Sequence, residues 1–164
     1  MLIGWAALVT AAAHVAGDLL EIGAYKGRTT SALALVGRVT AVDTFLGGGS
    51  MPEEDSYPAF AANIQSRELG VVVCRGDSRQ VVPDLSGPFR VIVVDGDHRE
   101  ETAYADLVHA WDKLSVGGYL FIDDINYPSI VLAMNQWALG LKNGEMAFTA
   151  VTPKLGMAKR LTAT

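Results

Sequence analysis

The chain has 164 residues, half of them hydrophobic, and this composition predicts one folded domain over residues 1–164 rather than a disordered chain. Its formal net charge of −5 disfavours a nucleic-acid partner, because an acidic protein gains little from binding a phosphate backbone. Cys74 is the single cysteine, so an intrachain disulfide and a cysteine-rich zinc site are excluded, which suits a reducing cytoplasm.

The apolar start of the chain, Met1–Ala16, has the composition of a signal or membrane segment but not its other features. No Lys or Arg precedes the apolar run, and the run stops at Gly17, which is too short to cross a bilayer. We therefore expect a short helix that packs on the domain, a cytoplasmic protein and no membrane partner.

Strand and helix patterns alternate along the rest of the chain, which predicts an α/β domain with a mostly parallel sheet. The expected strands are Asp18–Ile22, Arg38–Val42, Val71–Cys74, Arg90–Val94 and Tyr119–Ile122. The expected helices are Arg28–Val36, Ala59–Leu69, a short helix from an N-cap at Ser78 to just before Pro83, Glu100–Leu114 ended by Gly117-Gly118, and Ser129–Leu141. The last segments, Met146–Val151 and Gly156–Leu161, predict a hairpin, so one of its strands must run antiparallel to the sheet.

The polar stretch Thr44–Pro58 is the longest segment without a helix or strand pattern. It contains three consecutive glycines, Gly47 to Gly49, and loops of this length in compact domains are usually functional. We expect it to act as a lid over the substrate.

Acidic residues follow the ends of several predicted strands. They are Asp43, Asp77, Asp95, Asp123 and Asp124. A single aspartate in such a place is usually a turn or helix-capping residue. Ligands of open α/β sheets bind at the carboxyl ends of the strands, so several acids at that edge together predict a binding site.

The turn after the first strand carries Gly23 and Gly27, which permit a tight turn and a close approach of the backbone to a ligand. Asp43 follows Gly23 by 20 residues, the spacing at which an acid reaches ribose hydroxyls. The turn reads G-x-x-x-G and lacks the central glycine of dinucleotide binders. It therefore favours a cofactor with an adenosine but no phosphate, such as S-adenosylmethionine.

The stretch Glu21–Thr29 resembles the first motif of the metal-dependent small-molecule O-methyltransferases, which include the catechol, macrolide-sugar and cephalosporin-type enzymes. The stretch from Val93–His98 through Trp111 to Asp123-Asp124 is similar to the second half of that pattern, and most similar to the sugar-type group. The resemblance implies a Rossmann-like class I methyltransferase fold. Such a fold has a seven-stranded sheet of order 3-2-1-4-5-7-6, with strand 7 antiparallel and helices on both faces.

The resemblance also implies S-adenosylmethionine as cofactor and a set of residues that bind it. These residues are Glu21, Gly23, Ala24, Tyr25, Thr29, Asp43, Thr44, Gly76, Asp77, Ser78 and Asp95. Glu21, Gly23, Tyr25 and Thr29 would surround its methionine part, and Asp43 would hold its ribose. Gly76, Asp77 and Ser78 would line the adenine edge, while core packing remains an equal alternative for Tyr25.

For chemistry, the resemblance implies a divalent cation on Asp95, Asp123 and Asp124. Three carboxylates form a hard site that suits Mg²⁺ first, although Asp123 and Asp124 could instead cap the next helix. Asp124 stands where catechol-type enzymes have an amide. His98, three residues after Asp95, would be the general base that deprotonates a hydroxyl of a small-molecule acceptor.

Three other functions remain open at this point: an NAD(P)-dependent oxidoreductase, a non-catalytic S-adenosylmethionine-binding protein, and a metal-independent methyltransferase in which His98 acts alone. A homo-oligomer is compatible with the pattern. Asp106 and Trp111 match the family helix, and we expect them to serve packing and solvation. We expect His14 and His109 to be structural.

Overall fold

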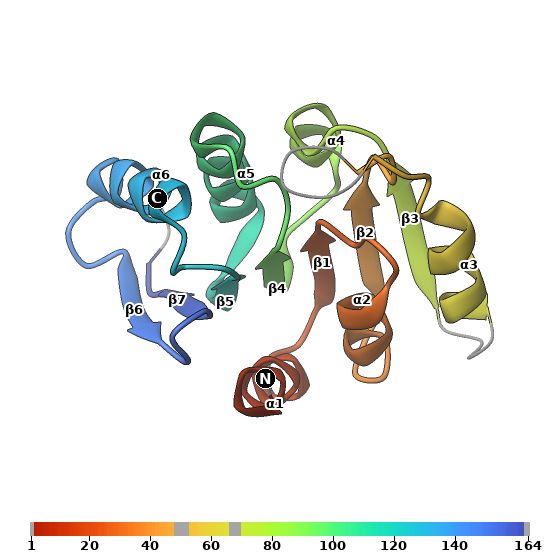
Figure 1. The fold of residues 1–164 in the computed structure, drawn as a ribbon. Coiled ribbons are helices and arrows are strands. Elements are labelled where there is room, and N and C mark those ends of the chain that lie inside the picture. Colours follow the sequence, from red (N-terminus) through yellow and green to blue (C-terminus); the bar gives the residue numbers. More distant parts are fainter. Residues whose placement is uncertain (1, 48–52, 66–69, 163–164) are drawn as a thin grey trace.

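The computed structural model describes residues 2–47, 53–65 and 70–162, whose strands form one seven-stranded sheet (Figure 1). The strand order is β3-β2-β1-β4-β5-β7-β6, as predicted. The strands are β1 Asp18–Ile22, β2 Val39–Asp43, β3 Val71–Arg75, β4 Phe89–Val94, β5 Leu114–Ile122, β6 Met146–Ala150 and β7 Gly156–Arg160. The first five strands are parallel, and β7 runs antiparallel to both β5 and β6.

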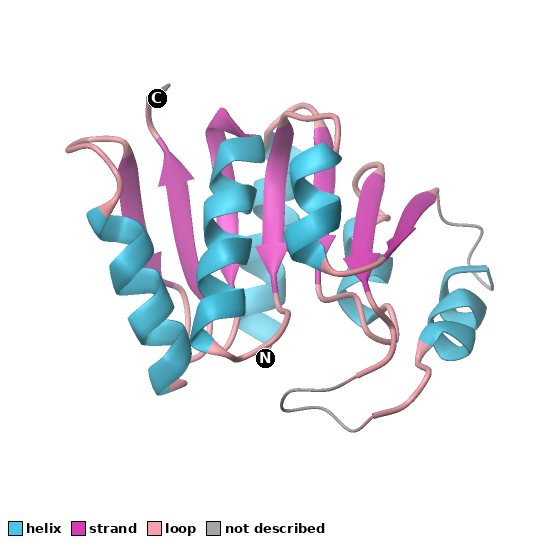
Figure 2. Ribbon diagram, turned by 90° about the horizontal axis from the view of Figure 1, so that it is seen from above, coloured by secondary structure: helices cyan, strands magenta, loops and turns pink. Residues whose placement is uncertain are grey.

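Helices cover both faces of the sheet, which confirms the predicted layering (Figures 1 and 2). They are α1 Leu2–His14, α2 Arg28–Leu33, α3 Tyr57–Gln65, α4 Ser78–Asp84, α5 Glu100–Lys113 and α6 Pro128–Leu139. The first three pack on one face and the last three on the other. Strands β1 and β4 lie between the two layers and are almost entirely buried, as the apolar runs of parallel strands require.

Helix α1 packs on the sheet through Leu8 and Ala12, in one cluster with Val91 and Phe121. This agrees with the expectation of a short helix that docks on the domain. Within the described ranges, no helix combines the length and the apolar character that crossing a bilayer requires.

Two predicted helix ends are wrong. Helix α4 is capped by Asp77, whose carboxylate accepts the Arg79 amide at 3.0 Å, while Ser78 is already the first helical residue. The helix also continues through Pro83 to Asp84, because a proline in the last turn removes only one backbone hydrogen bond.

The glycine pair Gly117-Gly118 does not end α5. Strand β5 begins directly at Leu114 and runs through both glycines. Gly117 has φ +81°, and a Cβ atom on Gly118 would lie 2.7 Å from the carbonyl oxygen of Arg90. The glycines therefore allow the start of β5 to bend closely against β4, whose pairing with β5 is irregular between Phe89 and Val91.

Other boundaries move by a few residues. Helix α2 ends at Leu33 rather than Val36, and α3 begins at Tyr57 rather than Ala59. The predicted end of α3 at Leu69 lies outside the described residues.

Candidate active site

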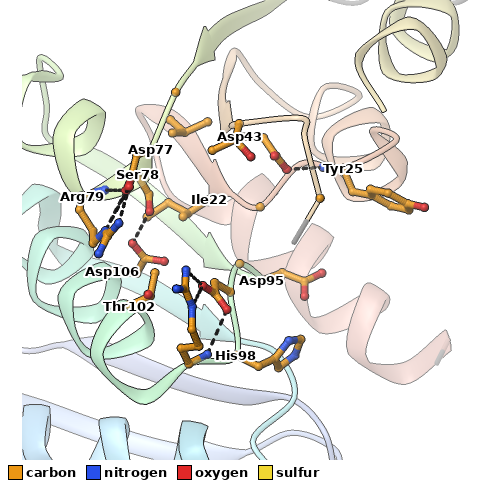
Figure 3. Close-up of a pocket in the computed structure, with 18 of the residues that line it drawn as sticks. Ile22, Tyr25, Asp43, Asp77, Ser78, Arg79, Asp95, His98, Thr102 and Asp106 are labelled. Atoms are coloured by element: carbon orange, nitrogen blue, oxygen red, sulfur yellow. Dashed lines mark hydrogen bonds and ion pairs between the residues drawn. The ribbon is translucent and has the colours of Figure 1, made fainter. Parts of the chain in front are cut away.

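A cavity of about 340 Å³ opens at the carboxyl ends of β1, β2, β3 and β4 (Figure 3). Its lining includes ten of the residues singled out in the sequence. These are Gly23, Tyr25, Asp43, Thr44, Gly76, Asp77, Ser78, Asp95, His98 and Asp124. The lining does not include Glu21, Ala24, Thr29 or Asp123. The edge of the sheet at which the acids were predicted to meet is therefore hollow.

The turn after β1 is held open to this cavity by glycine. Gly23 has φ +90°, and a Cβ atom there would lie 2.0 Å from the carbonyl oxygen of Asp95. Tyr25 also has a positive φ, +47°, and its amide donates to Oδ2 of Asp43 at 2.7 Å. The turn thus lies directly against the ends of β4 and β2.

Asp43 orders the backbone around it. Its Oδ2 accepts the Tyr25 amide and its Oδ1 accepts the Phe45 amide, both at 2.7 Å. Each carboxylate oxygen carries a second lone pair, which is what accepting a ribose hydroxyl requires. Asp43 therefore combines a fixed position with acceptor capacity toward the cavity (Figure 3).

The described end of the predicted lid that contains Glu54 is tied to the same turn. The Tyr25 hydroxyl donates to Glu54 at 2.5 Å, and the Lys26 ammonium lies 2.9 Å from the same carboxylate. Residues 48–52 of the predicted lid lie outside the described residues, so the closing motion stays a prediction.

Glu21 lies behind the cavity wall rather than in it. The residue is 1% exposed, and the Thr30 hydroxyl donates to its carboxylate. Burial raises the pKa of Glu21 from 4.5 to about 8, the Thr30 bond lowers it, and the charges of Asp95 and Asp43 raise it further. Glu21 is consequently protonated through most of the neutral range.

This raised pKa predicts how stability depends on pH. Below pH 4.5 Glu21 is protonated in both the folded and the unfolded chain. Between 4.5 and about 8 the unfolded chain ionises first, so this residue's contribution to stability is lost as pH rises. Glu21→Gln should therefore raise the free energy of unfolding at pH 8 by up to a few kcal/mol, with little gain at pH 4. Urea titrations at the two pH values measure this, with exposed Glu100→Gln as control. An equal change in the free energy of unfolding at pH 4 and pH 8 would contradict the raised pKa of Glu21.

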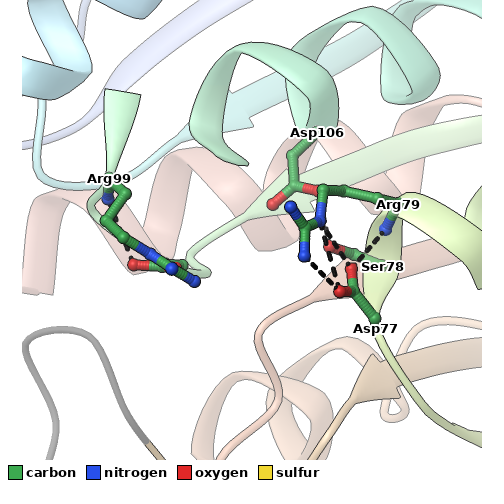
Figure 4. A network of polar contacts seen from close by, with 6 residues as sticks. Asp77, Ser78, Arg79, Arg99 and Asp106 are labelled. Atoms are coloured by element: carbon green, nitrogen blue, oxygen red, sulfur yellow. Dashed lines mark hydrogen bonds and ion pairs between the residues drawn. The ribbon is translucent and has the colours of Figure 1, made fainter. Parts of the chain in front are cut away.

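The part of the cavity lined by α4 and α5 carries a polar network around Asp106 that sequence analysis missed (Figure 4). Ser78 donates to Asp106 at 2.6 Å, and Asp77 binds the Arg79 guanidinium, with Oδ1 at 3.0 Å from Nε. Burial raises the pKa of Asp106 to about 6, against the lowering effect of the Ser78 bond. Asp106 was expected to serve packing and solvation, yet it is buried and lines the cavity. The available signal was a charged residue between Ala103 and Leu107 on the apolar face of its helix.

His98 and Asp124 contact each other in another part of the cavity lining. The imidazole Nε2 lies 2.8 Å from Oδ2 of Asp124, and the Tyr127 ring centroid lies 4.8 Å from that of His98. Asp124 has φ +54°, a conformation that aspartate tolerates better than most residues. Its second oxygen, Oδ1, lies 3.2 Å from the ammonium of Lys154. Asp124 is therefore shared between an imidazole and an ammonium group.

Asp95 is the most perturbed acid of the cavity lining. Burial raises its pKa to about 7, and the charges of Asp123, Asp124 and Asp43 add to this, while Lys154 opposes it. Burial also raises the pKa of Asp123. Any positive group that enters this corner is therefore attracted by several acids.

As they are arranged, Asp95, Asp123 and Asp124 are not grouped as metal ligands. Carboxylate oxygens suit a hard cation, but Asp123 accepts the Asp124 amide at 2.8 Å and both oxygens of Asp124 face His98 and Lys154. Across the described part of the chain, no three His, Cys, Asp or Glu side chains are grouped as metal ligands. The alternative that Asp123 and Asp124 cap α6 is wrong, because the N-cap of this helix is Tyr127, without a side-chain bond.

Comparisons with solved structures show what the fold is similar to. A putative methyltransferase from Streptococcus mutans in complex with SAH has a TM-score of 0.77 at 13% identity, over 96% of this chain and 98% of that one. An rRNA methylase from Streptococcus thermophilus has a TM-score of 0.74 at 16% identity, over 94% of each chain. A TDP-rhamnose 3′-O-methyltransferase of calicheamicin biosynthesis has a TM-score of 0.70 at 22% identity, over 96% of this chain and 77% of that one.

No curated protein matches the sequence. A family model described as a methyltransferase domain matches residues 20–125, which run from β1 to just beyond β5 and include every strand end that lines the cavity. This match covers more than half of the chain and disfavours the oxidoreductase alternative. The chain therefore belongs to the methyltransferase-domain family.

Proposed function

We propose that this protein binds S-adenosylmethionine in the cavity and transfers its methyl group to a hydroxyl of a small molecule. The observation that carries the proposal is the His98–Asp124 pair, a base with its orienting carboxylate, in the lining of the same cavity as Asp43. The methyltransferase family model and an S. mutans neighbour solved with SAH support the choice of cofactor.

The residues expected to hold the cofactor are those that surround the cavity. Asp43 would accept the ribose hydroxyls, and Gly76 to Ser78 would line the adenine edge, with Gly23 allowing the backbone to approach. When bound, S-adenosylmethionine supplies an electrophilic methyl group on a positive sulfonium. The acids around Asp95 favour such a cation in this corner.

His98 supplies the proton acceptor. Its Nε2 lies against Oδ2 of Asp124, and the imidazole takes the proton of the acceptor hydroxyl. Asp124 fixes the ring and stabilises the imidazolium that forms. Bound S-adenosylmethionine would supply the methyl carbon to the acceptor oxygen, and its sulfur would keep the electron pair of the carbon–sulfur bond. The Mg²⁺ predicted from the sequence is not part of this proposal, since His98 and Lys154 already share Asp124.

A small-molecule acceptor is favoured over RNA by the net charge of −5. The sugar O-methyltransferase among the neighbours supports a hydroxyl as the acceptor group. The proposed location is the cytoplasm, and the predicted homo-oligomer is also retained as a proposal.

The experiment is an assay with S-adenosylmethionine labelled on its methyl group. The protein and the labelled cofactor are incubated in parallel with sugar nucleotides, with catechols and with RNA. The label transferred to each acceptor is then measured. Label on a sugar or catechol oxygen would support the proposal. Label on RNA alone would overturn the acceptor class. Absence of calorimetric S-adenosylmethionine binding would overturn the function itself.

The role of Asp43 gives a direct prediction for cofactor binding. Asp43→Ala removes hydrogen bonds from a charged acceptor, so the affinity for S-adenosylmethionine should fall by about 1.5–3 kcal/mol. Asp18→Ala is the matched control, because this exposed carboxylate lies at the opposite end of β1 and pairs with Arg38. Calorimetry on both folded variants measures the effect, and an unchanged affinity in Asp43→Ala would contradict the ribose assignment.

A further inference from the structure

The turn between β6 and β7 brings a lysine to the acidic end of β5. The Ile125 amide donates to the backbone carbonyl of Lys154 at 2.9 Å, which docks the turn beside Asp124. The Lys154 amide in turn donates to Oγ1 of Thr152 at 3.2 Å. The position of Lys154 is therefore set by backbone contacts, and its ammonium reaches Oδ1 of Asp124 at 3.2 Å.

This ammonium is at one end of a chain of three groups. Asp124 uses Oδ1 for Lys154 and Oδ2 for His98, so the carboxylate is held between a cation and the proposed base. The charge of Lys154 also acts on Asp95 and Asp123. All three acids that the sequence assigned to a metal ion are therefore within the electrostatic reach of one lysine.

A divalent cation on Asp124 would compete with this ammonium for Oδ1. A lysine ammonium has three donors and no lone pair, so it cannot act as a metal ligand while charged. Its positive charge lies 3.2 Å from Oδ1 of Asp124 and repels a second cation that approaches this oxygen. Both oxygens of Asp124 are thus occupied by His98 and Lys154, and no three-ligand group is found in the described residues.

We propose that the Lys154 ammonium takes the place of the divalent cation in this site, balancing the acids and holding Asp124 in position against His98. Lys154 is a positioning residue that acts through Asp124. Its part in methyl transfer rests on the proposed function, whereas its exclusion of a metal ion does not.

The test is a titration with Mn²⁺ followed by electron paramagnetic resonance, on the full chain without acceptor. Wild-type protein should bind Mn²⁺ only weakly at this site. Lys154→Met, which keeps the length of the side chain but removes the charge, should bind Mn²⁺ at least about tenfold more tightly than wild type. Lys154→Arg keeps the charge and should behave as wild type.

Two controls separate this effect from a general change in charge. Lys159→Met removes the same charge from β7, where the ammonium lies 5.3 Å from the Tyr119 ring centroid, and should bind Mn²⁺ no more tightly than wild type. Asp124→Asn in the Lys154→Met background should abolish the gained binding. Tight Mn²⁺ binding by wild type, or no gain in folded Lys154→Met, would overturn the proposal.

The Mn²⁺ titration needs no acceptor, so its failure is distinct from failure of the proposed function. Once an acceptor has been identified, excess chelator should leave the turnover of wild type unchanged. Lys154→Met should lose turnover while keeping its affinity for S-adenosylmethionine, and added Mg²⁺ should restore part of the loss. A chelator that abolishes wild-type turnover would also overturn the proposal.

Discussion

Replacing His98 with alanine is expected to lower turnover about 10²–10⁴-fold, the range for losing a positioned general base. The imidazole is the only group of the His98–Asp124 pair that can accept a proton and then carry it as a cation beside a carboxylate. Asp43 and Gly76 lie elsewhere in the cavity lining, so the affinity for S-adenosylmethionine should stay close to that of wild type. Single-turnover assays with labelled cofactor, together with calorimetry, measure the two quantities separately.

His14→Ala is the matched control for this variant. His14 is exposed at the end of α1, and its ring contacts the Thr10 carbonyl of its own helix at 2.7 Å. The His14→Ala variant should therefore have the turnover of wild type. Full activity in His98→Ala would remove the base assignment and favour simple positioning of the acceptor. Cofactor binding without transfer to any acceptor, in wild type as well, would favour the non-catalytic alternative.

The layout of the sheet and the edge that carries the site were predictable from sequence. Asp43 and Asp95 each follow an apolar strand, and parallel strands present their carboxyl ends at one edge. The terminal hairpin likewise required an antiparallel strand. The alternation of strands and helices, the edge and the antiparallel strand follow from local patterns and the fixed geometry of parallel sheets, whereas the strand order was implied by the family resemblance.

The partner of each acid was not predictable in the same way. Lys154 and Asp124 are 30 residues apart, and their contact depends on how the β6–β7 turn docks on Ile125. No periodicity encodes that docking. The same limit applies to Ser78, which was expected to cap α4 but donates to Asp106 across the gap between two helices.

The roles predicted for glycines were right at Gly23 and wrong at Gly117 and Gly118, and the difference has a physical reason. A glycine in a sequence signals conformational freedom but not which constraint uses it. Gly117 and Gly118 were assigned to the end of a helix and instead bend a strand. Gly23 was assigned to close approach at the first turn, and the structure shows that close approach directly.

Gly23→Ala is expected to destabilise the protein by more than about 3 kcal/mol. The new Cβ atom would lie 2.0 Å from the carbonyl oxygen of Asp95 and 2.7 Å from the amide nitrogen of Gly96. Both are backbone atoms of the segment that follows β4, so neither can move aside as a flexible side chain would. Relief of the overlap must separate the ends of β1 and β4, the two strands that contribute Gly23 and Asp95 to the cavity.

The positive φ of Gly23 contributes a cost of its own, which Gly144→Ala isolates. Gly144 has φ +85°, close to the +90° of Gly23, but a Cβ atom there would meet nothing within 4 Å. Gly144→Ala should therefore cost only about 1–2 kcal/mol, the penalty for a side chain in that conformation. Urea titration compares the two variants, and equal losses would show that the overlap with Asp95 is relieved without cost. Any folded Gly23→Ala protein should also bind S-adenosylmethionine more weakly than Gly144→Ala, because the displaced strand ends form the wall of the cavity.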